Sequence, residues 1–456
     1  MEALSEGVLM EQTETIVNTQ EAHRPAPPTV FIPQPQSVEE SGLHSGLLLD
    51  LCIKCIYFAG RPSARQIGVH LTLPFPIVEE LLDFLKHEQF VEVVGSGGAG
   101  EAQYKYALTI KGMEKAEEVL RRGQYNGPAP VSFEQYVEVQ HQQSVRGLRI
   151  DSVTEKKELS HLILDENTLS ALGAAVNSGR SMLLYGDSGN GKSSAAAALG
   201  RMLPGEVLIP YAFEYNGHII RVFDPRVHVE IKEETDSERR AEEIPPPHDE
   251  RRRDRRWVKA TRPVVMAGGS LSLQDLELRY SDVSKFYVAP LQVKANGGVL
   301  VIDDFGRQLI EPKELLNRWI VPLEQGVDHL ALHTGDSIEM PFDLLLVFST
   351  NLPPRQLGDE AFFRRIRHKI EMPDPTRENF ARIFKRVCES KEISCPEDTL
   401  SYLLDEQYAK KGRPFRGCHP RDIVELAESI ANYKGEPVRL TRELVDLACS
   451  FYFVDL

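Results

Sequence analysis

The sequence predicts an α/β domain with a parallel sheet, preceded by a small α+β domain and followed by a bundle of helices. Three observations lead to this prediction. Helix and strand patterns alternate from Asp151 to about Pro373, which is typical of parallel strands joined by helices. Three helical patterns and a hairpin pattern come before this segment, and four helical patterns come after it. The length of 456 residues also favours several domains over one.

The composition excludes several classes of protein. With 41% hydrophobic residues, the chain can bury a sizeable core. Its 53 Lys and Arg against 68 Asp and Glu give a net charge of −15, which disfavours general binding to nucleic acids or anionic membranes. Six cysteines in a chain of this length argue against a disulfide scaffold. No apolar run approaches the roughly 18 residues of a membrane span, and the N-terminus has no signal-peptide pattern, so we expect a cytoplasmic protein without membrane insertion.

The first two segments are a leader and a small domain. Residues 1–40 contain five prolines and predict a disordered, mobile leader. Within residues 41–125 we expect three helices, a hairpin and a last helix, over Leu47–Phe58, Ser63–His70, Pro74–Phe90, Val91–Val94 with Tyr104–Leu108, and Thr109–Arg122. This order resembles a winged-helix domain. Cys52 and Cys55 have no second Cys or His pair nearby, so we expect buried thiols.

The remaining boundaries follow changes in composition. Residues 126–150 open with two prolines and predict a linker, residues 151–373 the α/β domain, and residues 374–456 a helical lid with helices over 376–390, 396–411, 420–432 and 441–452. An insertion is expected over about 211–290, with a hairpin at Asn216-Gly217. Glu230–Arg256 in this insertion is acidic first and arginine-rich last. It fits a nucleic-acid patch or an exposed loop whose charges cancel, and we favour the loop.

A phosphate-binding motif opens the α/β domain. The apolar strand Ser181–Tyr185 runs into a GxxxxGKS sequence, and the helical pattern Ala195–Leu203 follows. Glycines let backbone N–H groups face phosphates, and the helix N-terminus adds partial positive charge. Lys192 can reach the β- and γ-phosphates, and Ser193 can ligate Mg²⁺. The predicted nucleotide-binding residues are Gly186, Asp187, Ser188, Gly189, Asn190, Gly191, Lys192, Ser193 and Ser194.

Acidic and amide side chains follow two later apolar strands. Gly298–Ile302 ends in Asp303 and Asp304. We expect Asp303 to hold Mg²⁺ together with Ser193, and Asp304 to polarise the attacking water rather than merely cap the strand. The strand Leu344–Ser349 ends in Thr350-Asn351, and an amide there could orient that water.

Arginines follow at two further places. Arg364 and Arg365 come after an apolar pair and could reach the γ-phosphate of a neighbouring subunit, or could form an ordinary basic helix end. Arg421 follows Pro420, which suits the first turn of a lid helix, and would face the nucleotide from the lid.

Taken together and in this order, these motifs resemble an AAA+ ATPase over roughly residues 151–456. The stretch from Ala289 to Gly298 is similar to the MoxR, Mg-chelatase and helix-2-insert branch. The resemblance implies that Asn351 is sensor 1, that Arg364 and Arg365 are the arginine-finger pair, and that Arg421 is sensor 2. It also implies a ring, commonly a hexamer, with ATP between subunits and a remodelled protein partner.

One departure from the family concerns Asp304, where the usual residue is Glu. A misplacement of about 1 Å can cost on the order of 100-fold in rate, so turnover could be slow unless the backbone has shifted to compensate. The sequence therefore leaves two ATP-dependent functions open. One is a machine that remodels or chaperones proteins, and the other is a slow switch or scaffold.

A third function, a DNA-linked regulator using the winged helix, is disfavoured. The third helix of the small domain carries Glu79, Glu80, Asp83 and Glu88 against Lys86, and these acids repel phosphates. We expect this domain to dock a protein partner. Phe286-Tyr287 in the insertion could be a pore loop that grips a substrate, but local packing of the two rings is favoured.

Overall fold

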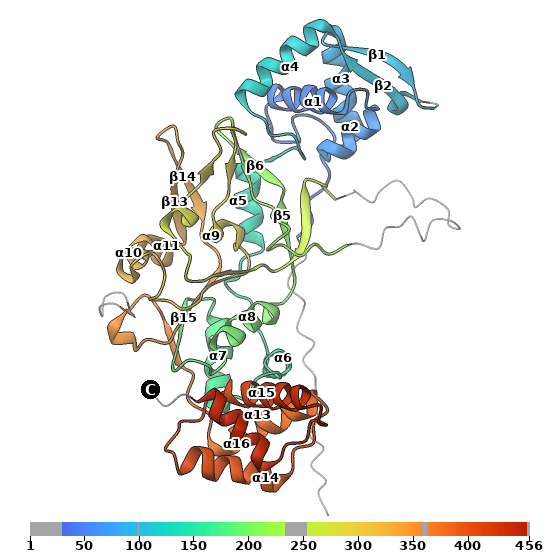
Figure 1. Cartoon of the computed structure of the whole chain (residues 1–456). Helices are drawn as coiled ribbons and strands as arrows, with labels where there is room; N and C mark the ends of the chain where they lie inside the picture. The colour runs from blue at the N-terminus through green and yellow to red at the C-terminus, as the bar shows by residue number, and fades with distance from the viewer. Residues whose placement is uncertain (1–29, 99, 233–252, 358–362, 454–456) are drawn as a thin grey trace, which may run out of the picture.

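The computed structural model describes residues 30–98, 100–232, 253–357 and 363–453. Figure 1 shows helices α1–α4 with the hairpin β1–β2 at one end of the molecule and helices α13–α16 at the other, with the other strands between them. No helix in these ranges is both long and apolar enough to cross a membrane.

The N-terminal domain has the predicted order of three helices, a hairpin and a helix. Its elements are α1 (Ser45–Ala59), α2 (Ala64–Leu71), α3 (Phe75–His87), β1 (Val91–Ser96), the 3₁₀ turn η1 (Glu101–Gln103), β2 (Tyr104–Leu108) and α4 (Ile110–Arg122). Local sequence explains the helix starts. Ser63 and Gln66 form a capping box before α2, and the Thr109 side chain accepts from the Gly112 N–H before α4.

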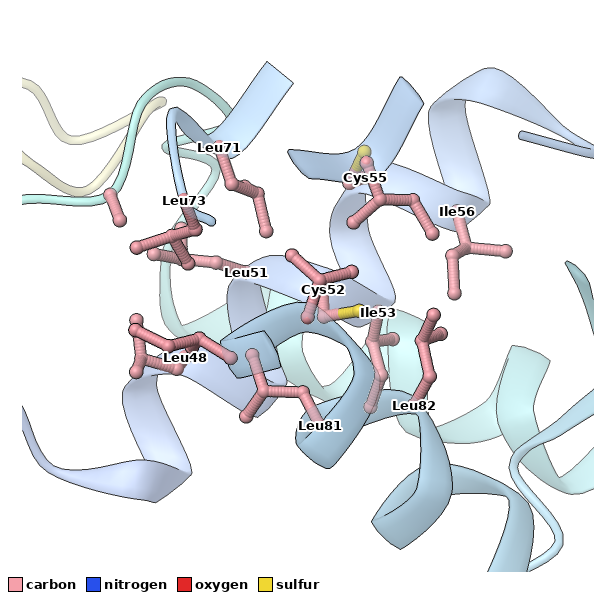
Figure 2. Packing of buried hydrophobic residues seen from close by; sticks show 14 of the residues in the cluster. Leu48, Leu51, Cys52, Ile53, Cys55, Ile56, Leu71, Leu73, Leu81 and Leu82 are labelled. Atoms are coloured by element: carbon pink, nitrogen blue, oxygen red, sulfur yellow. The ribbon is translucent and has the colours of Figure 1, made fainter. Parts of the chain in front are cut away.

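The core of this domain forms around α1. Figure 2 shows Leu48, Leu51 and Cys52 of α1 packed with Leu81 and Leu82 of α3. Both cysteines of α1 are buried free thiols, as predicted. Burial raises the pKa of Cys55 to about 11, so this thiol stays protonated and inert at neutral pH.

The segment 126–150, for which we predicted a linker, has structure of its own. It contains β3 (Val131–Ser132) and α5 (Phe133–Gln142). Tyr136 and Val139 of α5 are buried in a core that also contains Phe213 and Trp257. The two prolines before Val131 suggested a linker, but they only precede a short strand and an amphipathic helix that packs on distant residues.

The leader also differs where the structure describes it. Residues 1–29 lie outside the described residues. Val30 and Ile32 pack against the same core as α5, and Val38 is buried in the core of the N-terminal domain. The Asp254 N–H donates to the Ile32 carbonyl at 2.9 Å, so residues 30–40 are held by contacts that a proline-rich composition cannot reveal.

A parallel five-stranded sheet forms the centre of the α/β domain, which confirms the predicted fold class. Its strand order is β16 (His368–Glu371), β4 (Met182–Tyr185), β15 (Leu345–Thr350), β12 (Val299–Ile302) and β9 (Val264–Ala267). Helices α7 (Glu166–Ser178) and α8 (Lys192–Met202) pack on one face, and α10 (Pro312–Arg318) packs on the other. Strand β9 lies within the range 211–290 that we assigned to an insertion, yet it belongs to this sheet.

The short helices around this sheet are α6 (Ser152–Glu158), α9 (Leu291–Lys294) and α11 (Ile320–Gln325), with 3₁₀ turns at Leu273–Leu276 and Pro354–Gln356.

A second five-stranded sheet lies next to the N-terminal domain (Figure 1). Its order is β10 (Arg279–Tyr280), β11 (Tyr287–Val288), β7 (His218–Arg221), β6 (Ala212–Tyr215) and β3. Two further pairs are β5 (Glu206–Pro210) with β8 (Trp257–Thr261), and β13 (Val327–Ala331) with β14 (Ser337–Pro341). The predicted hairpin joins β6 and β7, with Asn216 and Gly217 at φ 49° and 81°, the left-handed pair that a two-residue turn requires.

Two expectations about the insertion can be compared with the structure. Residues 233–252 of the charged stretch lie outside the described residues. At its end, Asp254 and Arg256 are almost fully buried instead of exposed, because Arg256 donates to Asp254 and to the Ser41 and Pro130 carbonyls.

The Phe286 ring packs edge-on against Tyr125, and Tyr287 is buried. Both observations agree with the expected local packing of this aromatic pair.

The C-terminal region is a bundle of helices, as predicted. It contains α13 (Arg377–Ser390), α14 (Glu397–Tyr402), the π-helical turn η4 (Leu403–Ala409), α15 (His419–Lys434) and α16 (Arg442–Tyr452). Pro420 lies in the first turn of α15, where its missing N–H costs nothing. Phe380, Tyr408 and Ile423 lie at the centre of its core.

Candidate functional site

The loop Gly186–Gly191, called the phosphate loop below, joins β4 to α8 and has a backbone geometry suited to hold phosphates. Gly186, Gly189 and Gly191 have φ of 137°, 88° and 80°, in the region that L side chains rarely adopt. A Cβ at Gly186 would lie 2.4 Å from the Met372 carbonyl oxygen, and one at Gly189 would lie 2.4 Å from Cys418 Sγ. Only glycine fits at these two positions.

Lys192 begins α8 with its ammonium turned into the loop. Its Nζ donates to the Gly186 carbonyl at 2.9 Å and to the Asp187 carbonyl at 2.7 Å. The side chain is buried, and this burial lowers the pKa of Lys192, against the opposing charges of Asp187 and Asp303. A buried cation beside a glycine loop is suited to bind an anion that replaces its lost hydration.

The acidic residues meet this loop because β4, β15 and β12 are neighbours in the sheet. Ser193 Oγ donates to Asp303 Oδ1 at 2.9 Å, and Asn351 Nδ2 donates to Asp304 Oδ1 at 3.2 Å. Carboxyl ends of adjacent parallel strands meet at one edge of the sheet, which is where ligands bind in open α/β sheets. The structure therefore brings together four of the predicted site residues.

A cavity of about 840 Å³ opens beside these groups. It is lined by Ser188–Ser194, Asp304, Asn351 and, from the lid, Arg421. Arg421 is exposed and pairs with Asp422 at 3.2 Å, so its guanidinium is at the rim. The residues present fit a nucleoside triphosphate with Mg²⁺: the glycine loop and Lys192 suit phosphates, and the Ser193–Asp303 pair is a hard oxygen donor set of the kind Mg²⁺ takes alongside phosphates and water.

The lid contributes contacts that the sequence analysis did not predict. Arg416 Nη1 donates to Asp187 Oδ2 at 2.5 Å and also to Asp374. Asn190 Nδ2 donates to Asp374 Oδ1 at 2.7 Å, and the Gly417 N–H donates to Asn190 Oδ1 at 3.1 Å. The lid is thus tied directly to the phosphate loop. No spacing rule connects residue 416 with residue 187, so local motifs carry no signal for this contact.

Arg364 and Arg365 lie elsewhere. Residues 358–362, which precede them, are outside the described residues. The two arginines line a different cavity, of about 450 Å³, and Arg365 Nε donates to Glu324 Oε1 at 2.7 Å. The structure does not bring them to the phosphate loop of their own chain.

Comparisons with known proteins are weak. A family model described as a domain of unknown function (DUF8689) matches residues 376–451, the helices of the lid. No curated protein matches the chain. Among solved structures, the chain is similar to NtrX from Brucella abortus in complex with ATP, with 14% identity, a TM-score of 0.39, and coverage of 82% of this chain and 75% of that chain.

Two further similarities are of the same order. NtrX from Brucella abortus in complex with ADP has 15% identity and a TM-score of 0.38 over 74% of this chain, and the match spans 65% of that chain, just under two thirds. A mutant of RuvB from Thermotoga maritima has 15% identity and a TM-score of 0.35, over 66% of this chain and 70% of that chain. Similarities of this size assign neither a family nor a function.

Proposed function

We propose that the chain binds ATP with Mg²⁺ at Gly186–Ser194, the loop and the first turn of α8, and hydrolyses it, as an AAA+ type ATPase. The observation that carries this proposal is the set of two short contacts, Ser193 to Asp303 and Asn351 to Asp304, beside a glycine cradle and a buried lysine. Phosphoryl transfer needs positioning and charge stabilisation more than covalent chemistry. This arrangement supplies both from adjacent strand ends.

Each residue has a distinct proposed role. Lys192 exchanges its two carbonyl partners for phosphate oxygens, and Ser193 and Asp303 would hold Mg²⁺. Magnesium, when bound, neutralises charge on the phosphates. Asp304 accepts the proton of a water, and the Asn351 amide holds that carboxylate and orients the water. Arg421, at the rim of the cavity, contacts the phosphates from the lid.

We further propose that the chain works as a homo-oligomer, as a ring such as a hexamer, in which Arg364 and Arg365 reach the nucleotide of a neighbouring subunit. Both arginines lie away from the phosphate loop of the same chain, and this supports an action on the nucleotide of a neighbouring subunit.

The N-terminal domain is proposed to dock a protein partner, which ATP turnover remodels. A slow ATP-dependent switch is the second candidate, since Asp304 is one methylene shorter than Glu.

Replacement of Lys192 tests the binding step. Lys192→Ala removes the cation and keeps the glycine loop, so ATP affinity should fall at least about tenfold, as expected when a charged hydrogen bond is lost. Titration calorimetry with ATP and Mg²⁺ measures this change. Lys410→Ala, which removes an exposed lysine paired with Glu406, is the matched control and should leave affinity unchanged. Equal ATP affinity of Lys192→Ala and wild type would reject the assignment.

A further inference from the structure

The cavity beside Arg365 opens at the edge of the central sheet opposite to the phosphate loop. Ser181, Leu344 and Arg367 line it, and they directly precede β4, β15 and β16. These three strands are parallel neighbours, so their amino ends share this edge. The four residues of β4 separate the two cavities by roughly 13 Å. A ligand here cannot be the nucleotide held by the phosphate loop of the same chain.

Arginines dominate the lining of this cavity. Five of them converge on about 450 Å³, and among the described lining residues Glu324 is the one acidic side chain; the arginines are Arg146, Arg180, Arg364, Arg365 and Arg367. This is a local excess of positive charge in a chain whose net charge is −15. Cations placed around one space repel each other, and an anion inside that space removes the repulsion.

The arginines come from separate parts of one chain and are held by neighbouring structure. Arg146 lies between α5 and α6, and its guanidinium covers Gly326, where an added Cβ would come within 2.6 Å of Nη2. Arg180 lies between α7 and β4. Ser181 Oγ donates to the Arg365 carbonyl at 3.2 Å, which ties the segment of Arg180 to that of Arg365. A single chain therefore builds the whole cavity.

We propose that this cavity is a second phosphate-binding site, which takes an oligophosphate of two or three phosphoryl groups, with Arg146 and Arg180 as ligands beside Arg364, Arg365 and Arg367. The planar guanidinium forks match phosphate oxygens two at a time. The volume lies in the range of small-molecule sites. Pro322, Phe342 and Leu346 form an apolar wall, which lowers the competition from water.

The phosphates can come from two sources: a free small molecule, or the nucleotide held by a neighbouring copy of the chain. The first source is independent of the proposed ATPase function. The second source rests on the proposed ATPase function, and the experiments below distinguish the two sources.

Titration calorimetry of the full chain with inorganic tripolyphosphate tests the free source. In Lys192→Ala, which weakens the phosphate loop, we expect binding at one site to remain at a protein concentration where sedimentation shows a monomer. Adding Arg146→Ala and Arg180→Ala should weaken this binding at least about tenfold, since each removes charged hydrogen bonds. Adding Arg61→Ala and Arg65→Ala, which removes two exposed arginines of the N-terminal domain, should not change it.

Mixing experiments test the neighbouring source. If Lys192→Ala binds no tripolyphosphate, then Arg146→Ala/Arg180→Ala in an otherwise wild-type chain should slow ATP hydrolysis with unchanged ATP affinity. Doping such subunits into wild type should then lower activity more than dilution does. Arg146→Lys/Arg180→Lys keeps the positive charge and loses the guanidinium forks. Its tripolyphosphate affinity, or its rate of ATP hydrolysis, should lie between those of the chain with both arginines and the double alanine variant.

The assignment is overturned if Lys192→Ala binds no tripolyphosphate and the arginine double variant hydrolyses ATP like wild type. If the chain hydrolyses no ATP at all but Lys192→Ala binds tripolyphosphate through Arg146 and Arg180, the proposed ATPase function fails and the phosphate site stands.

Discussion

The backbone at Asp304 has a left-handed conformation. Its φ is +50°, which is uncommon outside glycine and which Asp and Asn tolerate better than other residues. The turn is held on its C-terminal side, since the Phe305 N–H donates to the Ser349 carbonyl at 2.7 Å and Thr350 Oγ1 donates to the Phe305 carbonyl at 2.7 Å. An Asp at this place fits the local backbone, and this favours the view that the chain has adapted to the shorter acid.

Two substitutions at Asp304 test this view. Asp304→Glu should not raise ATP hydrolysis, and it should cost about 1 kcal/mol of stability because Glu adopts the left-handed region poorly. Asp304→Asn keeps the turn and removes the charge, so it should abolish hydrolysis while preserving ATP binding. Steady-state phosphate release and thermal unfolding measure these effects. A faster Asp304→Glu enzyme of unchanged stability would instead show that the shorter acid limits turnover.

His419 gives the lid a dependence on pH. Burial, assisted by the positive charge of Arg416, lowers the pKa of His419 to about 4 from an ordinary 6.5. The unfolded chain therefore binds more protons than the folded chain between these values. The stability linked to His419 is fully present above pH 6.5 and is lost as the pH falls towards 4.

Thermal unfolding of His419→Gln followed by circular dichroism tests this dependence. Between about pH 7 and 4.5, its unfolding temperature should fall less than that of wild type. His329→Gln, which alters a half-exposed histidine near Glu339, should follow wild type. Parallel pH curves for wild type and His419→Gln would contradict the assignment.

At the scale of elements, α5 is part of the core of the second sheet. The Tyr136 ring is fully buried, stacks on Phe213 with centroids 4.9 Å apart, and its hydroxyl accepts from Asn296 Nδ2 at 3.1 Å. Strand β3 just before it pairs with β6. Residues 126–150 therefore help to build the second sheet and its core.

Tyr136→Ala should lower the free energy of unfolding by about 3–5 kcal/mol, the usual loss for a large aromatic ring in a core. Tyr136→Phe keeps the ring and loses one hydrogen bond, at about 1 kcal/mol. Urea unfolding distinguishes the two. By the same reasoning, a chain that starts at Asp151 should be much less stable than one that starts at Gly127. Equal stability of Tyr136→Ala and Tyr136→Phe would show that α5 is peripheral.

At the scale of the whole molecule, the N-terminal domain lies at one end of the structure (Figure 1). The N-terminal domain exposes a number of large apolar side chains, namely Phe58, Val69, Phe84, Val93, Val94, Tyr104, Ile110 and Met113. Among the same elements, α3 carries acidic residues on its surface. Apolar and acidic surface suits a protein partner better than a nucleic acid.

An isolated domain of residues 41–125 should fold, since its core comes mainly from its own helices. It should not retard duplex DNA at low salt, where attraction to phosphates is strongest. A gel-shift series over salt concentration makes the measurement. DNA binding that weakens steeply with added salt would favour the regulator hypothesis over protein docking.

The sequence by itself determined the features that depend on neighbouring residues. The glycine loop before Lys192, the capped helices of the N-terminal domain, the Asn216-Gly217 turn and the helices of the lid all follow from local spacing and backbone preference. The pairing of Ser193 with Asp303 was also foreseeable, because parallel strands bring their carboxyl ends to one edge.

The tertiary structure alone decided the features that join distant segments. We assigned the segment of β9 to an insertion and that of α5 to a linker, because local patterns do not show that β9 joins the central sheet or that Phe213 covers α5. The contact of Arg416 with Asp187 and the gathering of five arginines at the amino ends of the strands have no signal in local spacing. Such contacts depend on packing between elements, and packing free energy is shared among residues that lie far apart in the sequence.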